Sequence, residues 1–165
     1  MPKLIKDGVI TANQWQRLDR DAAPDQVAVG QYLIPLALWS EQPETWSGKL
    51  GSKGLTITST DTLESVGDQV NQFSVIEVYF PAFMDGRGFS LGRLLRERYG
   101  FTGELRASGK IIRDQLCYLR RCGFNAFAFD DETIDLETAI TSLNDFTDGY
   151  QASVDQPLPL FMRRG

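Results

Sequence analysis

Residues 85–90, which read DGRGFS, carry the clearest potential for chemistry in this sequence. A short apolar run before them predicts a strand, and Ser90 followed by leucines at helical spacing predicts a helix after them. In α/β proteins ligands bind where strands end and helices begin, and the free amides of a helix start favour anions. The sequence therefore predicts an oxyanion site at Arg87 and the backbone from Gly88 to Ser90. Arg106, at the end of the next predicted strand, is expected to join it.

The same segment also has a purely structural explanation. Its glycines would form a tight turn, Asp85 would bond the loop backbone, and Arg87 would lie at the surface. A single glycine-rich turn is weak evidence of binding, so the structural explanation is favoured. The segment does not match the dinucleotide fingerprint, because Gly92 comes one position late and Arg106 stands where that motif requires an acidic residue.

Asp85 and Asp114 are the catalytic candidates if the protein is an enzyme. Together with Arg87 and Arg106 they would act on a small anionic metabolite at the carboxyl edge of the sheet. Asp114 also falls in the first turn of a predicted helix, where a carboxylate commonly does no more than stabilise the helix dipole. The chain contains no histidine, which excludes Ser-His-Asp and Cys-His catalysis and histidine-dependent zinc and haem sites. We expect no bound cofactor and no metal.

The two cysteines, Cys117 and Cys122, are spaced C-x4-C. Residues five apart on one helix do not face each other, so the spacing predicts neither a disulfide nor a thioredoxin-type motif. Two thiols alone cannot hold an iron–sulfur cluster. We expect both to be small buried apolar residues.

The overall charge argues against nucleic-acid binding. The 165 residues include 17 basic and 22 acidic side chains, a net charge of -5, whereas nucleic-acid binders usually carry a basic surplus. The basic residues nevertheless concentrate in the middle of the chain, as a locally positive face or as a set of solvated helix surfaces. No signal-like opening and no apolar stretch of membrane length is present, so we expect a cytoplasmic protein with no membrane contact.

Alternating strands and helices must position these residues. Residues 4–10 resemble a hairpin in which Asp7 and Gly8 form the turn. The remaining pattern predicts strands over 27–29, 55–58, 75–80, 104–107 and 124–129 and a loop over 46–54. It predicts helices that begin at 36 and continue past 39, that span 62–70, that run from Ser90 to Tyr99, that contain Ile112, Leu116 and Leu119, and that span 135–150.

Repeated βα units predict an α/β fold with a mainly parallel sheet and right-handed crossovers. Four to five units suit an open doubly wound sheet or a partial barrel, because a full eight-fold barrel needs about 250 residues. Two chains together could complete such a barrel, so a homodimer is an alternative to the monomer. We expect a single domain over 1–165, with a hairpin and linker at 1–26, a βα core at 27–150 and an extended tail at 151–165.

Several segments together resemble a known bacterial family. They are DGRGFSLGRLLRERYG at 85–100, GELRA at 103–107, RDQLCYLRRCGF at 113–124, the opening KLIKDG at 3–8 and YQASVDQP at 150–157. The family consists of uncharacterised proteins that are named oxidoreductases of sulfite reduction and tend to be encoded beside assimilatory sulfite reductase. The resemblance covers nearly the whole chain and carries no established active site.

The resemblance implies an accessory protein of assimilatory sulfite reduction. Such a protein would bind sulfite reductase or a small sulfur oxyanion. The residues give no support to the word oxidoreductase, since the sequence holds no flavin, nicotinamide, haem or cluster motif. Whether the protein is an enzyme is therefore left open by the sequence.

Overall fold

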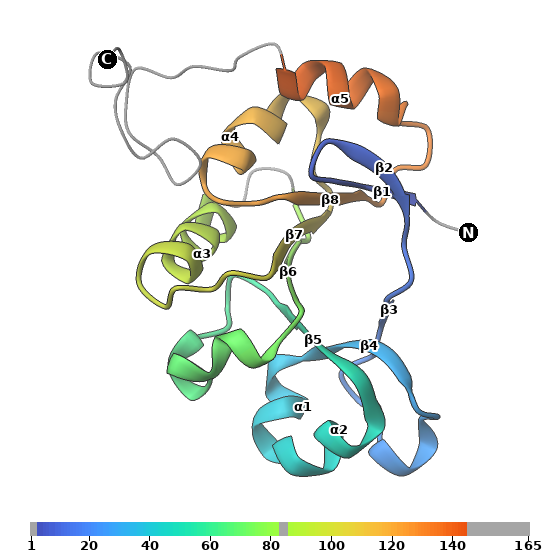
Figure 1. Ribbon diagram of the computed structural model, residues 1–165, viewed down its shortest axis with the longest axis vertical. Coiled ribbons are helices and arrows are strands. Elements are labelled where there is room, and N and C mark those ends of the chain that lie inside the picture. The colour runs from blue at the N-terminus through green and yellow to red at the C-terminus, as the bar shows by residue number, and fades with distance from the viewer. Residues whose placement is uncertain (1–2, 83–85, 145–165) are drawn as a thin grey trace.

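The curled sheet in Figure 1 organises the computed structural model, which describes residues 3–82 and 86–144. Within these residues, eight strands form one sheet in the order β2-β1-β8-β7-β6-β5-β4-β3. Strands β3 to β8 are parallel, while β1 is antiparallel to both β8 and β2. The strands are β1 Lys3–Lys6, β2 Val9–Ala12, β3 Gln16–Arg17, β4 Gly30–Pro35, β5 Leu50–Ile57, β6 Val75–Phe80, β7 Glu104–Gly109 and β8 Ala126–Phe129. The predicted α/β fold with a mainly parallel sheet is confirmed, in its partial-barrel form.

The helices cover one face of this half-barrel. They are α1 Leu36–Glu41, α2 Pro43–Lys49, α3 Gly86–Glu97, α4 Leu116–Arg121 and α5 Leu136–Asn144, with 3-10 turns at Pro24–Gln26, Leu63–Ser65, Gly67–Gln72 and Arg113–Gln115. Side chains alternate along each strand, so one set joins the apolar core under the helices and the other faces the opposite side. In β6, Ile76, Val78 and Phe80 belong to the core. Glu77 and Tyr79 therefore lie on the inner, concave face.

The N-terminal hairpin is confirmed, and its turn follows from two residues. Asp7 and Gly8 both have positive φ, at 51° and 79°, as a two-residue hairpin turn requires. The segment that joins β2 to β3 then runs past the side of the sheet opposite α3 and α4 (Figure 1). It thereby brings Asn13 and Arg17 to the inner face.

Several predicted boundaries are wrong, each for a physical reason. Residues 27–29 are irregular, and the strand begins only at Gly30. Residues 46–54 are not a loop, because Trp46 is buried on α2 and Gly54 packs in β5, where a Cβ would lie 2.6 Å from Trp15. The helix expected over 62–70 consists of 3-10 turns, interrupted by the positive φ of Gly67.

The helix expected around Ile112, Leu116 and Leu119 begins only at Leu116, and Ile112 lies in extended backbone before the 3-10 turn that precedes it. Ile112 is 40% exposed and Ile111 is buried in its place, while Leu116 and Leu119 are buried as expected. Cys122 is buried and Cys117 half-buried, and both thiols are free, so the absence of a disulfide between them is confirmed. The second half of the last predicted helix and the tail at 151–165 lie outside the described residues. No helix in the described part of the chain is both long and apolar enough to cross a membrane.

Candidate functional site

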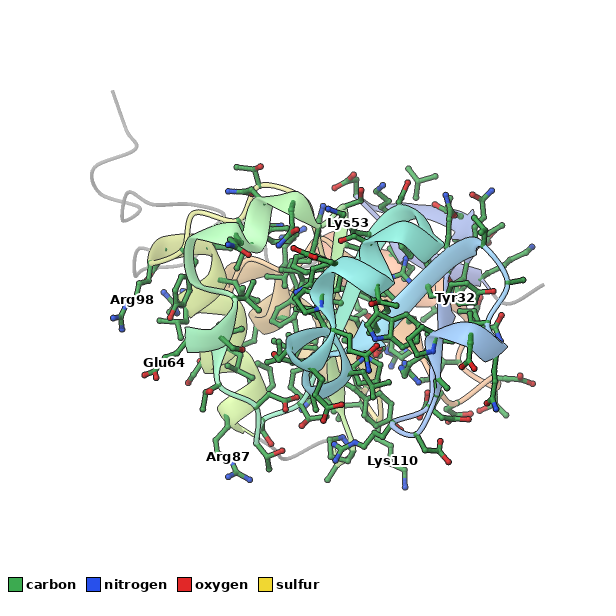
Figure 2. All side chains as sticks on the ribbon, turned by 90° about the horizontal axis from the view of Figure 1, so that it is seen from below. Tyr32, Lys53, Glu64, Arg87, Arg98 and Lys110 are labelled. Carbon is green, nitrogen blue, oxygen red and sulfur yellow. The ribbon has the colours of Figure 1, made fainter. Side chains whose placement is uncertain are left out.

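The structure separates the residues of the predicted oxyanion site. The catalytic candidate Asp85 lies outside the described residues. Arg87 is exposed in the first turn of α3, and Figure 2 shows it at the periphery of the molecule, pointing outward. Ser90 does not cap this helix, because α3 already begins at Gly86 and Ser90 stands in its second turn. Gly88 is buried against the ring of Phe80, so that glycine serves packing.

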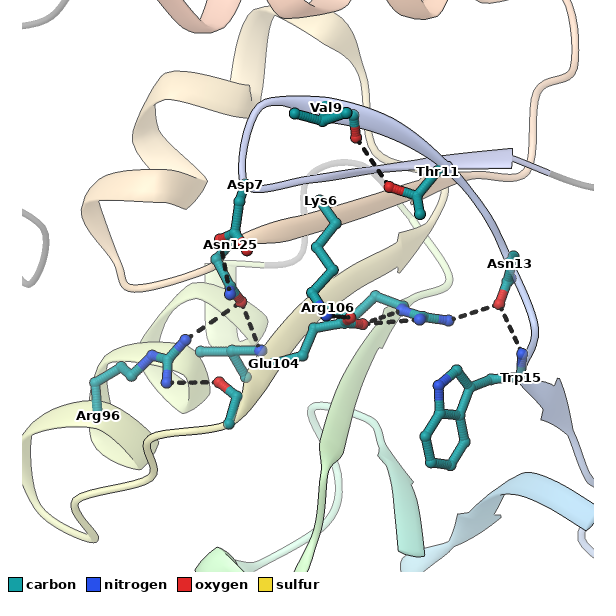
Figure 3. A network of polar contacts seen from close by, with 12 residues as sticks. Lys6, Asp7, Val9, Thr11, Asn13, Trp15, Arg96, Glu104, Arg106 and Asn125 are labelled. Atoms are coloured by element: carbon teal, nitrogen blue, oxygen red, sulfur yellow. Dashed lines mark hydrogen bonds and ion pairs between the residues drawn. The ribbon is translucent and has the colours of Figure 1, made fainter. Parts of the chain in front are cut away.

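Arg106 belongs to a different environment from Arg87. It is 1% exposed on the inner face of β7, because its neighbours in the strand, Leu105 and Ala107, point to the core under the helices. Its Nη2 lies 2.7 Å from Oε2 of Glu104, and its Nη1 donates to Oδ1 of Asn13 over 3.0 Å (Figure 3). Arg106 and Arg87 are thus on opposite faces of the sheet and do not converge.

Asp114 is also remote from this inner face. It is exposed in the 3-10 turn Arg113–Gln115, which precedes α4. Among the described residues, the four-residue site of arginines and aspartates expected from the sequence is not assembled.

The inner face instead gathers a polar cluster around Arg17 and Glu77. The Nε and Nη2 atoms of Arg17 donate to the two carboxylate oxygens of Glu77 over 2.6 and 3.0 Å. Nη2 also donates to Oγ of Ser108 over 3.1 Å, and Oγ1 of Thr56 donates to Glu77 over 2.8 Å. Thr56, Glu77 and Ser108 come from the adjacent parallel strands β5, β6 and β7, and Arg17 reaches them from β3, which lies beyond β4 in the sheet.

Glu77 fixes both the position and the charge of Arg17. Burial disfavours the charged guanidinium, but the hydrogen bonds and negative charge of Glu77 outweigh it and leave the pKa of Arg17 above its ordinary value. The bidentate contact uses Nε and Nη2 and holds the guanidinium plane in one orientation. Nη1 takes no part in these bonds.

Tyr79 and Asp130 extend the cluster. The guanidinium carbon of Arg17 lies 4.5 Å from the centre of the Tyr79 ring, a cation–π contact. The Tyr79 hydroxyl donates to Oδ2 of Asp130 over 3.1 Å. Burial, followed by the negative charge of Asp130, raises the pKa of Tyr79, so this phenol stays a hydrogen-bond donor at neutral pH.

Two cavities meet at Arg17. The larger, about 490 Å³, lies at the carboxyl ends of β4, β5 and β6, and we call it the Arg17 cavity. Its lining combines the apolar residues Leu18, Pro35, Leu36, Ala37 and Pro81 with Arg17, Arg20, Asp19, Asp61, Tyr79 and a row of hydroxyls at Thr56, Thr58, Ser59 and Thr60. The smaller, about 210 Å³, lies deeper on the inner face beside Glu77, Ser108 and Asp130. Ligands of parallel sheets bind at this same edge.

Sequence reasoning missed the residues of this cluster, although one signal was available. Glu77 is the single charged residue in the apolar strand VIEVYF. A carboxylate in such a strand must be buried, and a buried carboxylate needs a partner. Arg17 gave no comparable signal, because it stands in a two-residue strand within a polar stretch.

Comparison with known proteins gives one match. The model of a bacterial protein family of unknown function matches residues 54–161, from within β5 onward. No curated protein and no solved structure matches the chain. Within the residues that the structure describes, no group of acidic and cysteine side chains is placed to hold a metal ion.

Proposed function

Since the chain belongs to the DUF934 family of bacterial proteins of unknown function, we propose a role for it from its site and its sequence resemblance. The role is that of an accessory protein of assimilatory sulfite reduction, which binds a small oxyanion in the Arg17 cavity. The pathway comes from the resemblance to proteins that are encoded beside sulfite reductase. The ligand class comes from the lining of the cavity.

The observation that carries the proposal is the orientation of Arg17. Glu77, which is 2% exposed, holds the guanidinium by two hydrogen bonds at the junction of both cavities. Binding through Arg17 therefore costs little side-chain entropy. The Thr60 hydroxyl adds a neutral donor in the same cavity, since the Thr56 hydroxyl donates to Glu77 and the Thr58 hydroxyl to Asp61.

The energetics are sufficient for a metabolite at millimolar concentration. Such an affinity requires about 4 kcal/mol. A hydrogen bond to a charged group contributes roughly 1.5–3 kcal/mol, so one bond from Arg17 with one or two hydroxyl bonds reaches this value. The acidic lining residues Asp19 and Asp61 offset part of the positive potential, which favours a singly charged anion over a doubly charged one.

Calorimetric titration of sulfite, sulfate and phosphate tests the site. We expect sulfite to bind the natural protein with millimolar or tighter affinity, and the double variant Arg17→Gln, Glu77→Gln to lose this binding. The double change removes the guanidinium without leaving a buried carboxylate unpaired. Arg87→Ala is the matched control, because Arg87 is the exposed arginine for which the sequence predicts the same ligand.

The outcome separates the competing sites. Loss of binding in Arg87→Ala, with binding intact in the double variant, would move the oxyanion to the start of α3. No binding of any of the three anions would contradict the ligand class. The pathway has its own test, because deletion of the gene should slow growth on sulfate and leave growth on cysteine unchanged. Equal growth on both would contradict the pathway.

A second candidate is an enzyme that acts on a small anionic metabolite in the same cavity. The contact between Tyr79 and Asp130 favours it, since it places a proton donor and a carboxylate beside Arg17. Conversion of the bound anion in the titration mixture, followed by ion chromatography, would distinguish catalysis from binding. An anion recovered unchanged would leave the accessory role.

A further inference from the structure

A groove between α3 and α4 lies on the outer face of the molecule, apart from the Arg17 cavity. It has a volume of about 480 Å³, and we call it the α3–α4 groove. Its lining includes Phe89, Leu94 and Tyr118 as apolar walls and Arg93 and Glu97 as polar ones. The groove belongs neither to the proposed oxyanion site nor to the apolar core.

Aromatic side chains make the wall of the groove rigid. The rings of Phe89 and Tyr118 lie 5.0 Å apart, and the ring of Phe89 lies 5.4 Å from that of Phe80 in the core. Tyr118 is nevertheless 52% exposed, and Ile112, just before α4, is 40% exposed. An exposed tyrosine that is held in place from below presents contact area at low entropic cost, which is the usual property of an interface hot spot.

The charge of this face is opposite to that of the whole protein. Residues 86–123 carry nine basic and three acidic side chains, while the full chain has a net charge of -5. Two of the basic residues point away from the groove, Arg106 on the inner face and Arg96 toward the carbonyl oxygens of Gly123 and Phe101, while Arg93 pairs with Glu97 of the same helix over 3.4 Å. The other seven belong to α3, the residue that directly follows it, α4 and the segment between β7 and α4.

One of these arginines, Arg93, lines the groove itself, and Arg121 stands beside Cys122 in the sequence at the end of α4. Burial raises the pKa of the Cys122 thiol at the groove floor, and the positive charges of Arg93 and Arg121 act against this rise. Both cations therefore lie close to the groove. Arg87 is exposed on the same helix as Arg93, and Arg98 is exposed directly after the end of that helix.

We propose that the α3–α4 groove docks an acidic segment of a partner protein, which places an apolar side chain against Phe89 and Tyr118. The apolar wall provides the anchor, and the surrounding arginines select carboxylates and accelerate association. A nucleic acid would be repelled by the acidic remainder of the molecule. The chain's own segment 145–165 carries three aspartates and two arginines, a net charge of -1 that complements the seven basic residues only weakly. The inference uses no residue of the Arg17 cavity and is independent of the proposed function.

Selection from a random peptide library displayed on phage tests the groove even though the partner protein is unidentified. The full chain is the bait, and the variant Tyr118→Ala is used for counter-selection. We expect the selected peptides to be rich in Asp and Glu around one large apolar residue. Synthetic copies should bind at least about tenfold more weakly to Tyr118→Ala and to the double variant Arg93→Glu, Arg121→Glu, and binding should weaken as salt rises.

Two variants serve as matched controls. Val29→Ala changes another strongly exposed apolar residue, and Lys53→Glu reverses a charge on β5; both should bind the peptides as the natural protein does. Failure to select peptides, selected peptides without an acidic excess, or equal binding to Tyr118→Ala would overturn the proposal. A DNA duplex, or a peptide of residues 145–165, that binds the groove more tightly than the acidic peptides would overturn it as well. So would a dimer in sedimentation that Tyr118→Ala dissociates.

Discussion

At the scale of single residues, the contact between Arg17 and Glu77 combines a structural and a functional role. Glu77 is almost fully buried, whereas the Arg17 side chain is 40% exposed. Removing the partner of a buried carboxylate lowers the free energy of unfolding by more than the intact pair contributes to it. Replacing both partners by well-packed apolar residues changes the free energy of unfolding little. Stability and ligand binding can therefore be separated at this site.

We expect Arg17→Ala to lower the free energy of unfolding by about 2 kcal/mol, because Glu77 is left buried with fewer donors. The double variant Arg17→Met, Glu77→Leu should lose less than this single variant, while it binds no anion. Urea unfolding followed by circular dichroism measures both. If the double variant loses the sum of the losses measured for Arg17→Met and Glu77→Leu separately, the pair is not energetically coupled and Arg17 is held by other contacts.

At the scale of elements, α3 shows why glycines in the sequence were misleading. Gly88 and Gly92 are buried residues of the helix, and a Cβ on them would overlap the rings of Phe80 and Phe124. The glycines let the helix approach β6 and the segment before β8 closely. Gly86 and Gly88, which the sequence pattern assigns to a loop, belong to the first turn of this helix.

Gly92→Ala should therefore destabilise the protein by about 2 kcal/mol, since an overpacked core outweighs the better helix propensity of alanine. Gly86→Ala is the matched control in the same helix, because no atom lies within 4 Å of its added Cβ. It should leave stability unchanged or raise it by up to about 1 kcal/mol. Urea midpoints report both, and equal midpoints for the two variants would contradict the packing explanation.

The sequence predicts the local elements of this fold but not the contacts between distant parts of the chain. The strand 75–80 and the hairpin at Asp7 and Gly8 were predictable, because β-branched runs and hairpin turns are local signals. The cluster of Arg17 and Glu77 was not, because 60 residues separate these partners and only the order of strands in the sheet brings them together. The sequence likewise does not reveal which side of a strand the helices cover, so it could not show that Arg106 and Arg87 lie on opposite faces of the sheet.

At the scale of the whole molecule, the N-terminal third completes the sheet and its polar interior. Lys6 bonds Glu104, Asn13 bonds Arg106, and Arg17 bonds Glu77, so each of the three inner-face charges has a partner from this part of the chain. Strand β1 also covers the edge of β8.

A fragment that begins at Gly54 should consequently fail to fold. It lacks β1 to β4, which leaves the edges of β5 and β8 exposed and Glu77 without its arginine. We expect little ordered secondary structure by circular dichroism and aggregation in gel filtration. Co-expression of residues 1–53 is the control and should restore a folded complex; a fragment that is folded and monomeric alone would contradict this account.

The order of strands also has a consequence in time, during synthesis on the ribosome. Strands β3 to β8 lie in the sheet in the order in which they are translated, so each new strand can add to the one before. The hairpin is made before all of the parallel strands but pairs with the sheet last, because Lys6 must wait for Ala126. At a translation rate of about 5–20 residues per second, the roughly 120 residues between them take about 6–24 s. For that interval the growing sheet carries an uncovered edge, and the hairpin residues, made before those of the parallel strands, are the ones that finally cover it.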